Sequence, residues 1–240
     1  MKKAIIVGAT SGIGREVAKV LLCDGWQLGL AGRREEALNE LQALAPERIS
    51  VEVLDVTAAD APQRLLRLIR QTGGMDLFLL TSGIGFHNVE LLPDIEIKTV
   101  DTNVEGFVRM VTAAFHFFSE QNDGHIAVVS SVAGTKGMGG APSYSASKRF
   151  QNTYIEALSQ LAHIRKLPIC FTDIRPGFVA TSLLDKNRSY PMLMDVEYVA
   201  HHIVRALRKR KRIAVIDWRY ALTVFFWRLL PGRMWERMKV

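Results

Sequence analysis

Hydrophobic and polar residues alternate along the chain in two different patterns. Short apolar runs are separated by longer stretches in which apolar residues recur at intervals of three and four positions. The short runs predict strands at residues 3–7, 27–31, 50–54, 76–80, 125–130, 169–174 and 212–216. The longer stretches predict helices at residues 13–22, 34–44, 62–70, 103–119, 146–164 and 196–207.

The order of these segments predicts the fold class. Strands that alternate with helices are typical of a parallel sheet covered by crossover helices on both faces. We therefore expect an α/β fold with one doubly wound, seven-stranded, mostly parallel sheet. No repeat or flexible linker divides the chain, so a single domain is expected, with Thr57 and Asp195 as candidate helix caps.

The composition agrees with one globular domain and shows where the charge lies. The chain has 240 residues and a net charge of +7. Residues 205–240 hold 11 basic and two acidic side chains, whereas residues 1–204 have a net charge of −2. A nucleic-acid-binding protein more often carries positive charge across its main binding face, so no nucleic-acid partner is expected.

Other features of the composition point to an intracellular protein. Cys23 and Cys170 have no metal-binding or redox spacing, which favours two buried thiols in a reducing compartment. The histidines lack the spacing of a metal site, so no metal is expected. The first apolar run is too short for a signal peptide, and no later run reaches the ~20 residues that span a bilayer. A cytoplasmic location is the expectation.

A glycine-rich turn follows the first predicted strand. Gly8, Gly12 and Gly14 lie between that strand and the first predicted helix. Glycines allow positive φ and close approach of a pyrophosphate, and a helix N-terminus adds N–H donors. The predicted dinucleotide site at this turn comprises Gly8, Thr10, Ser11, Gly12, Ile13 and Gly14.

Two arginines follow the second predicted strand, where dinucleotide-binding folds select their cofactor. A carboxylate there binds the ribose hydroxyl of NAD, whereas a guanidinium favours the 2′-phosphate of NADP. Arg33 and Arg34 occupy this position, and no carboxylate precedes Glu35. The sequence therefore favours NADP(H) over NAD(H). Two solvated arginines at the start of a surface helix are the alternative interpretation.

A tyrosine and a lysine lie four positions apart in Tyr144-Ser145-Ala146-Ser147-Lys148. On a helix this spacing places both side chains on one face. A tyrosine with an ordinary pKa of about 10 exchanges protons poorly at neutral pH unless a nearby cation stabilises its phenolate. The pair therefore predicts acid–base chemistry, with an ordinary surface pair as the alternative.

Together with three further motifs, these features resemble the short-chain dehydrogenase/reductase family, classical type. The other motifs are Asn103, Ser131 thirteen positions before Tyr144, and the segment that begins Pro176-Gly177. The resemblance covers about residues 3–216 and implies a Rossmann-type dinucleotide-binding fold.

The resemblance assigns roles to four residues. It implies that Tyr144 protonates the carbonyl oxygen as hydride arrives, and that Ser131 donates a hydrogen bond to the same oxygen. Lys148 would lower the pKa of the tyrosine and bind the nicotinamide ribose, and Asn103 would anchor the water that relays protons to Lys148. The implied activity is NADP(H)-dependent interconversion of a carbonyl compound and a secondary alcohol. A catalytically silent dinucleotide-binding scaffold or redox sensor is the alternative.

The resemblance also implies cofactor contacts outside the glycine turn. Asp55 matches the position that contacts adenine, and the segment after the sixth strand matches the wall beside the nicotinamide amide. The implied contacts are Arg33, Arg34, Asp55, Val56, Ser82, Gly83, Tyr144, Lys148, Pro176, Gly177, Val179 and Thr181. One motif departs from the family, because Thr81-Ser82-Gly83 stands where Asn-Ala-Gly is usual. The two hydroxyls are expected to replace part of the asparagine's role in steadying the sheet.

Apolar side chains dominate the loops that should surround the substrate. The candidate substrate contacts are Phe86, Met138, Phe178 and Leu183, and the few cations nearby are Lys136, Lys186 and Arg188. An apolar ketone is therefore the favoured substrate, whereas a mobile lid packed by these residues is the alternative.

Residues 217–240 follow the expected NADP-binding catalytic domain at 1–216. A basic run at 208–212 precedes Trp218, Phe225 and other apolar residues. This composition favours a helical extension packed on the domain or on a partner subunit of a homodimer or homotetramer. Peripheral contact with the inner membrane surface is the alternative.

Overall fold

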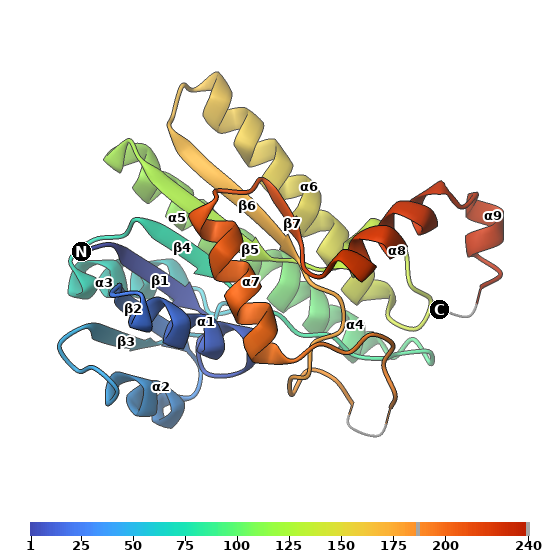
Figure 1. Ribbon diagram of the computed structural model, residues 1–240, viewed down its shortest axis with the longest axis horizontal. Helices are drawn as coiled ribbons and strands as arrows, with labels where there is room; N and C mark the ends of the chain where they lie inside the picture. Colours follow the sequence, from blue (N-terminus) through green and yellow to red (C-terminus); the bar gives the residue numbers. More distant parts are fainter. Residues whose placement is uncertain (186–187, 239–240) are drawn as a thin grey trace.

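A computed structural model describes residues 1–185 and 188–238 of the chain (Figure 1). Within them, one sheet of seven strands runs in the order β3-β2-β1-β4-β5-β6-β7, and all neighbouring strands are parallel. The strands are β1 Lys3–Val7, β2 Gln27–Gly32, β3 Ile49–Val53, β4 Leu77–Leu80, β5 Gly124–Val129, β6 Ile169–Arg175 and β7 Ile213–Val215. The predicted doubly wound sheet is therefore confirmed. The candidate cation Lys186 lies outside the described residues.

Helices cover both faces of the sheet (Figure 1). One face is covered by α1 Gly12–Cys23, α2 Glu35–Gln42 and α7 Val196–Arg208. The other face is covered by α3 Ala61–Thr72, α5 Phe107–Gln121 and α6 Pro142–Ile164. The further helical segments are α4 Pro93–Val100, the π-helical turn η1 Asp101–Gly106, the 3₁₀ turn η2 Val132–Thr135, α8 Trp218–Leu229 and α9 Gly232–Trp235.

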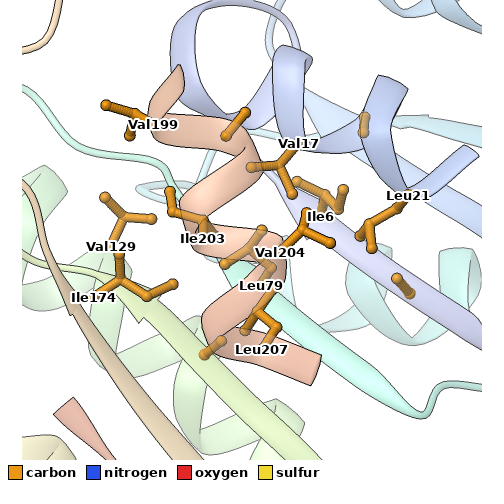
Figure 2. Close-up of a cluster of buried hydrophobic side chains, with 14 of the residues drawn as sticks. Ile6, Val17, Leu21, Leu79, Val129, Ile174, Val199, Ile203, Val204 and Leu207 are labelled. Carbon is orange, nitrogen blue, oxygen red and sulfur yellow. The ribbon is translucent and has the colours of Figure 1, made fainter. Parts of the chain in front are cut away.

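Alternate side chains of the central strands enter two separate cores. Ile6 of β1 packs between α1 and α7, where Val17 and Ile203 lie (Figure 2), whereas its neighbours Ile5 and Val7 enter the core under α3 and α5. All of these side chains are buried. Burial on both faces explains why the strands are continuously apolar in sequence rather than alternating with polar residues.

Two sequence predictions about helices need correction. The predicted helix at 103–119 is preceded by α4 and η1, and Asn103 lies in the π-helical turn. Thr57 does not cap α3, because its hydroxyl donates to Asp55 Oδ1 (2.8 Å) and the helix begins later, at Ala61. Asp195 does cap α7, where it accepts hydrogen bonds from the backbone of Glu197 and Tyr198.

The prediction of two buried thiols is wrong. Cys23 is exposed and Cys170 is only partly buried. Cys23 is the last residue of α1, on the side of the helix that points away from the sheet, whereas the buried residues Leu21 and Leu22 precede it. A position within an apolar stretch therefore did not fix the side of the helix on which the thiol lies.

β7 separates the basic run from the aromatic residues of the C-terminal segment. The run at 208–212 precedes β7, and α8 follows β7 at the carboxyl edge of the sheet. Arg208 pairs with Asp24 at the end of α1, and Arg212 donates to the Ile155 carbonyl of α6 (3.4 Å). α8 and α9 project from the side of the molecule (Figure 1). None of the helices in the described ranges is long and apolar enough to cross a bilayer.

Candidate active site

The carboxyl ends of the central strands bring the predicted site residues to one edge of the sheet. Gly8 follows β1, Gly83 follows β4, Ser131 follows β5 and Pro176 follows β6. The last two loops are joined directly, because the Val132 backbone N donates to the Pro176 carbonyl (3.1 Å). Motifs that are far apart in sequence therefore meet where doubly wound folds bind their ligands.

Ser131, Tyr144 and Lys148 form one acid–base group. α6 carries Tyr144 and Lys148 one turn apart, and Lys148 Nζ lies 5.8 Å from the centroid of the Tyr144 ring. Ser131 faces Tyr144 and influences its pKa, while its hydroxyl donates to the Pro176 carbonyl (3.4 Å) and accepts from the Ala133 backbone N–H (3.1 Å). Gly85 packs against the same ring, since a Cβ there would lie 2.5 Å from Tyr144 Cδ2. Sequence reasoning missed Gly85, although a second glycine so soon after Gly83 is a signal of close backbone approach.

The protonation properties of this group follow from its burial. Burial raises the pKa of the Tyr144 phenol, and the Ser131 side chain acts in the opposite direction. Burial lowers the pKa of Lys148 to about 8, and the negative charge of Asp173 acts against that shift. The expected lowering of the tyrosine pKa by lysine is therefore not found here. Lys148 Nζ instead donates to the Val129 carbonyl (3.1 Å) and to Gln151 (3.1 Å).

Asn103 and Lys148 are connected through Gln151. Gln151 Nε2 donates to the Asn103 backbone carbonyl (2.8 Å), and its Oε1 accepts from Lys148 Nζ (3.1 Å). The Asn103 side chain is fully buried and makes two bonds with the Ile84 backbone, at 2.9 and 2.7 Å. Sequence reasoning missed Gln151, although a glutamine one turn after Lys148 on the buried side of a helix signals a polar partner within the protein.

The glycine-rich turn has the geometry of a pyrophosphate cradle. Gly8 and Gly12 adopt φ values of +99° and +52°, and a Cβ at Gly14 would overlap the Gly8 carbonyl. Ser11 precedes α1, and within the described chain its side chain makes no capping hydrogen bond. The first backbone N–H groups of the helix therefore remain for a ligand. These residues fit a dinucleotide phosphate, because the glycines allow the tight turn that leaves the helix N-terminus open.

The two arginines after β2 differ in how they are held. Arg34 Nη2 donates to Thr10 Oγ1 (3.1 Å) and so lies against the glycine turn. Arg33 is 68% exposed, with Nη1 4.0 Å from Asp55 Oδ2. Burial acts to raise the pKa of Asp55, but hydrogen bonds from Thr57 and the charge of Arg33 bring it below its usual value. A cationic surface with one held guanidinium therefore borders the turn.

The remaining predicted cofactor residues surround the turn from other elements. Ile13 packs at the edge of the core between the sheet and helices α1 and α7. Ser82 N donates to the Val7 carbonyl (3.1 Å). Val56 packs against Gly106. Thr181 lies beside Gly12, where a Cβ would be 3.1 Å from Thr181 Cγ2. Gly177 lies against the Tyr220 ring, and Val179 bridges to Met194. The loop after β6 therefore reaches back to the loop after β1.

The four candidate substrate residues do not all line one cavity. Phe178 packs against Tyr190, with ring centroids 4.9 Å apart. Leu183 is exposed. Met138 lines a cavity of about 530 Å³ between the loop at 134–139 and the start of α6, and Tyr144 and Lys148 are not among its lining residues. Phe86 is exposed, with Lys98 Nζ 5.9 Å from the centroid of its ring, and Met138 lies in a separate cavity.

Comparison with known proteins identifies the family of this chain. The chain matches the family model for short chain dehydrogenase over residues 2–191. It belongs to the short-chain dehydrogenase family. This short-chain dehydrogenase is similar to an uncharacterized oxidoreductase of Myxococcus xanthus (strain DK1622). The two are 33% identical over 245 residues, and the alignment covers 98% of this chain and 95% of the relative.

Solved structures show the same fold at lower sequence identity. ElxO with NADP bound has a TM-score of 0.80 and 22% identity, with 92% of this chain and 99% of that chain covered. A 3-ketoacyl-(acyl-carrier-protein) reductase from Brucella melitensis, complexed with NADH, has a TM-score of 0.80 and 21% identity, with 90% and 96% covered. The chain is therefore an oxidoreductase of the short-chain dehydrogenase family with the fold predicted from its sequence.

This short-chain dehydrogenase departs from the family pattern after β4. Thr81 Oγ1 donates to the carbonyls of Val7 and Gly8, both at 3.1 Å. The hydroxyl therefore ties the end of β4 to the end of β1, which supports the expectation that Thr81 replaces part of the role of the usual asparagine. The Ser82 hydroxyl lies close to Gly8, where a Cβ would be 2.9 Å from its Oγ.

Proposed function

We propose that this short-chain dehydrogenase is an NADP(H)-dependent reductase that converts an apolar ketone to a secondary alcohol. The observation that carries the proposal is the group of Ser131, Tyr144 and Lys148, in which a half-buried tyrosine lies beside a buried serine and a buried lysine. The nicotinamide, when bound, would supply the hydride. The protein must then bind the carbonyl oxygen, stabilise its developing negative charge and deliver one proton to it.

Each of the three residues has a role in this reaction. Ser131 would donate a hydrogen bond to the carbonyl oxygen, and Tyr144 would protonate it as negative charge develops. The raised pKa keeps Tyr144 protonated at neutral pH, as a general acid requires. Lys148 has a pKa of about 8, so it carries its positive charge in most protein molecules at neutral pH. This charge would stabilise the phenolate left after proton transfer.

Replacing Tyr144 with phenylalanine tests the mechanism. Tyr144→Phe removes the proton donor and preserves the ring against Gly85, so ketone reduction should fall by at least about a hundredfold. The readout is NADPH oxidation over a panel of apolar ketones, with NADPH affinity measured by fluorescence as the control for an intact cofactor site. Tyr154→Phe, which removes a phenol between α5 and α6, is the matched variant and should retain activity.

The result also separates this proposal from the alternative scaffold or sensor function. Unchanged turnover in Tyr144→Phe would contradict the assigned acid. An unmodified chain that binds NADPH but reduces no ketone in the panel would instead favour the catalytically silent scaffold.

The NADP(H) preference rests on Arg34 and Arg33. A guanidinium held against the glycine turn by Thr10 matches the place where a 2′-phosphate would lie. Arg34→Ala should weaken NADPH binding about tenfold or more and leave NADH binding nearly unchanged, because a charge-assisted phosphate contact is lost. Arg70→Ala, an exposed arginine at the end of α3, is the control. Equal affinities for NADPH and NADH in the parent protein would contradict the preference.

A further inference from the structure

α8 is apolar on both of its faces, and one of them is uncovered. Trp218, Leu222, Phe225 and Leu229 recur at intervals of four, three and four residues, so they form one stripe along the helix. All four are exposed, Trp218 to 70% and Leu229 to 66%. Phe226 is 61% exposed beside this stripe and stacks edge-to-face on Phe225. These five residues are called the α8 outer face below.

The opposite side of α8 is anchored to the protein. Tyr220 and Val224 are buried in the core that also contains the inner sides of α1 and α7. Trp227 Nε1 donates to Thr135 Oγ1 (2.8 Å), and Trp235 of α9 donates to the Gly137 carbonyl (2.6 Å). The orientation of α8 is therefore fixed by its inner contacts. A stripe of large exposed apolar side chains, on a helix whose opposite side is already packed, is typical of a surface that contacts a partner.

The charges around the outer face indicate what that partner is. Arg219 and Arg228 lie on opposite sides of the stripe at helical spacing, and Arg233 and Arg237 follow in α9 and after it. Residues 217–238 contain four arginines and two acids, Asp217 and Glu236, and Asp217 pairs with Arg219 (2.8 Å), which leaves Arg228, Arg233 and Arg237 as the excess positive charge. A second copy docked on this face would bring arginines together with few acids to pair them. A partner that is apolar at its centre and anionic at its margins is complementary.

We propose that the α8 outer face docks on an anionic lipid surface. The apolar stripe would enter the boundary between headgroups and acyl chains, and Arg228, with Arg233 and Arg237, would contact lipid phosphates. Because no helix in the described residues can span a bilayer, the contact is peripheral. The basic run at 208–212 lies at the other end of β7 and is not part of this surface.

Vesicle sedimentation of the full chain tests the proposal. Vesicles of equimolar phosphatidylglycerol and phosphatidylcholine should bind the protein at low salt, whereas phosphatidylcholine vesicles should bind it far less. The double variant Phe225→Ser and Leu229→Ser should reduce the bound fraction at least about tenfold. Ile97→Ser with Ile164→Ser changes two similarly exposed residues on α4 and α6 and should leave binding unchanged.

A charge variant tests the contribution of the arginines beside the α8 outer face. Arg228→Gln with Arg233→Gln should weaken binding to the anionic vesicles about 25-fold, which is about fivefold for each arginine. Arg67→Gln with Arg70→Gln, on α3, is the matched control and should bind as the parent does. High salt should abolish the difference between the parent and the charge variant.

Three results would overturn the proposal. The first is an absence of sedimentation with anionic vesicles at low salt, and the second is equal binding by the outer-face and control variants. The third is a parent protein that is an oligomer, binds no vesicles and becomes a monomer in the Phe225→Ser, Leu229→Ser variant, because a second copy would then cover α8. Tyr144→Phe should bind vesicles normally, so a failure of the proposed reaction is distinguishable from a failure of docking.

Discussion

At the residue scale, Gln151 controls the environment of the lysine that a reductase of this family would use. Its side chain fills the space between the Asn103 carbonyl and Lys148 Nζ, at 2.8 and 3.1 Å, where the family resemblance implies a water. Gln151 is 1% exposed. Since the pKa of Lys148 is about 8, a change in its acceptor would alter the charge of Lys148 near neutral pH.

Two substitutions at Gln151 should move the pH dependence of activity in opposite directions. Gln151→Leu removes the oxygen that accepts from the ammonium, so the pKa of Lys148 falls and the alkaline limb of kcat/KM moves about one unit lower. Gln151→Glu places a carboxylate there, so the limb moves about one unit higher. Both variants lose the hydrogen bond to the Asn103 carbonyl. A change in the pH profile that came only from this lost bond would therefore be the same in both variants. Shifts in the same direction would contradict a positioning role.

A second residue, His125 at the start of β5, should make stability depend on pH. Burial, with the charge of Arg210, lowers its pKa to about 4, from 6.5. Between these values the folded chain binds fewer protons than the unfolded chain, so stability is lost as pH falls. His125 should contribute a loss of about 2 kcal/mol between pH 7 and pH 5.

Urea unfolding measures this contribution. His125→Asn keeps a polar partner for Thr172, which lies 2.8 Å from His125 Nε2, and removes the titrating group. The variant should therefore lose less stability than the parent over the same pH interval. An identical pH dependence in both proteins would assign the acid sensitivity to carboxylates instead.

The residues of the candidate site differ in how far sequence could predict them. Tyr144 and Lys148 are predictable because helical spacing alone brings them together. Gln151 and Gly85 are not, because their contacts depend on how α6 packs against η1 and the loop after β4. The direction of the Tyr144 pKa shift is also a tertiary property, since burial sets it and the lysine is engaged elsewhere.

At the scale of elements, α8 holds both loops that flank the candidate site. Tyr220 Oη accepts from Phe178 N (3.0 Å) and donates to the carbonyls of Pro191 (2.9 Å) and Met192 (3.1 Å). Through Trp227, the same helix contacts Thr135 in the loop after β5. α8 is therefore a structural part of the site's surroundings, and its loss would release both loops.

Tyr220→Phe should loosen the loop after β6 without unfolding the domain. The lost hydroxyl leaves Phe178 N without its acceptor, which costs about 1–3 kcal/mol locally. Chymotryptic cleavage after Leu193, an exposed residue of the same loop, should accelerate, and KM for the ketone should rise several-fold. Tyr154→Phe removes a phenol far from this loop and should change neither quantity. Cleavage at the parent rate would show that Tyr220 does not hold the loop.

The elements that sequence missed share a physical feature. The one buried residue of α4 is Thr99, and those of η1 are Asn103 and Gly106. Because their inner sides carry polar or small residues rather than an apolar stripe, hydrophobic periodicity has no signal there. The strands and α7, whose inner sides are apolar, were predicted to within a few residues of their observed bounds.

At the scale of the whole molecule, the excess positive charge of residues 205–240 is divided between two places. The basic run at 208–212 lies where β7 begins, whereas the arginines of α8 and α9 lie at the carboxyl edge of the sheet. The second group is therefore on the same edge as Ser131 and the glycine turn. Docking through the α8 outer face would hold the loops around the candidate site next to the lipid surface.

This placement predicts that docking matters for lipid-dissolved substrates. With NADPH, the parent should reduce a long-chain ketone carried in anionic vesicles at least about tenfold faster than the Phe225→Ser, Leu229→Ser variant, because the variant leaves the surface. A short, water-soluble ketone reaches the site from solution, so both proteins should reduce it equally. Ile97→Ser with Ile164→Ser should behave as the parent with both substrates. Equal losses on both ketones in the outer-face variant would mean that the substitutions damage the site itself, and that docking does not deliver the substrate.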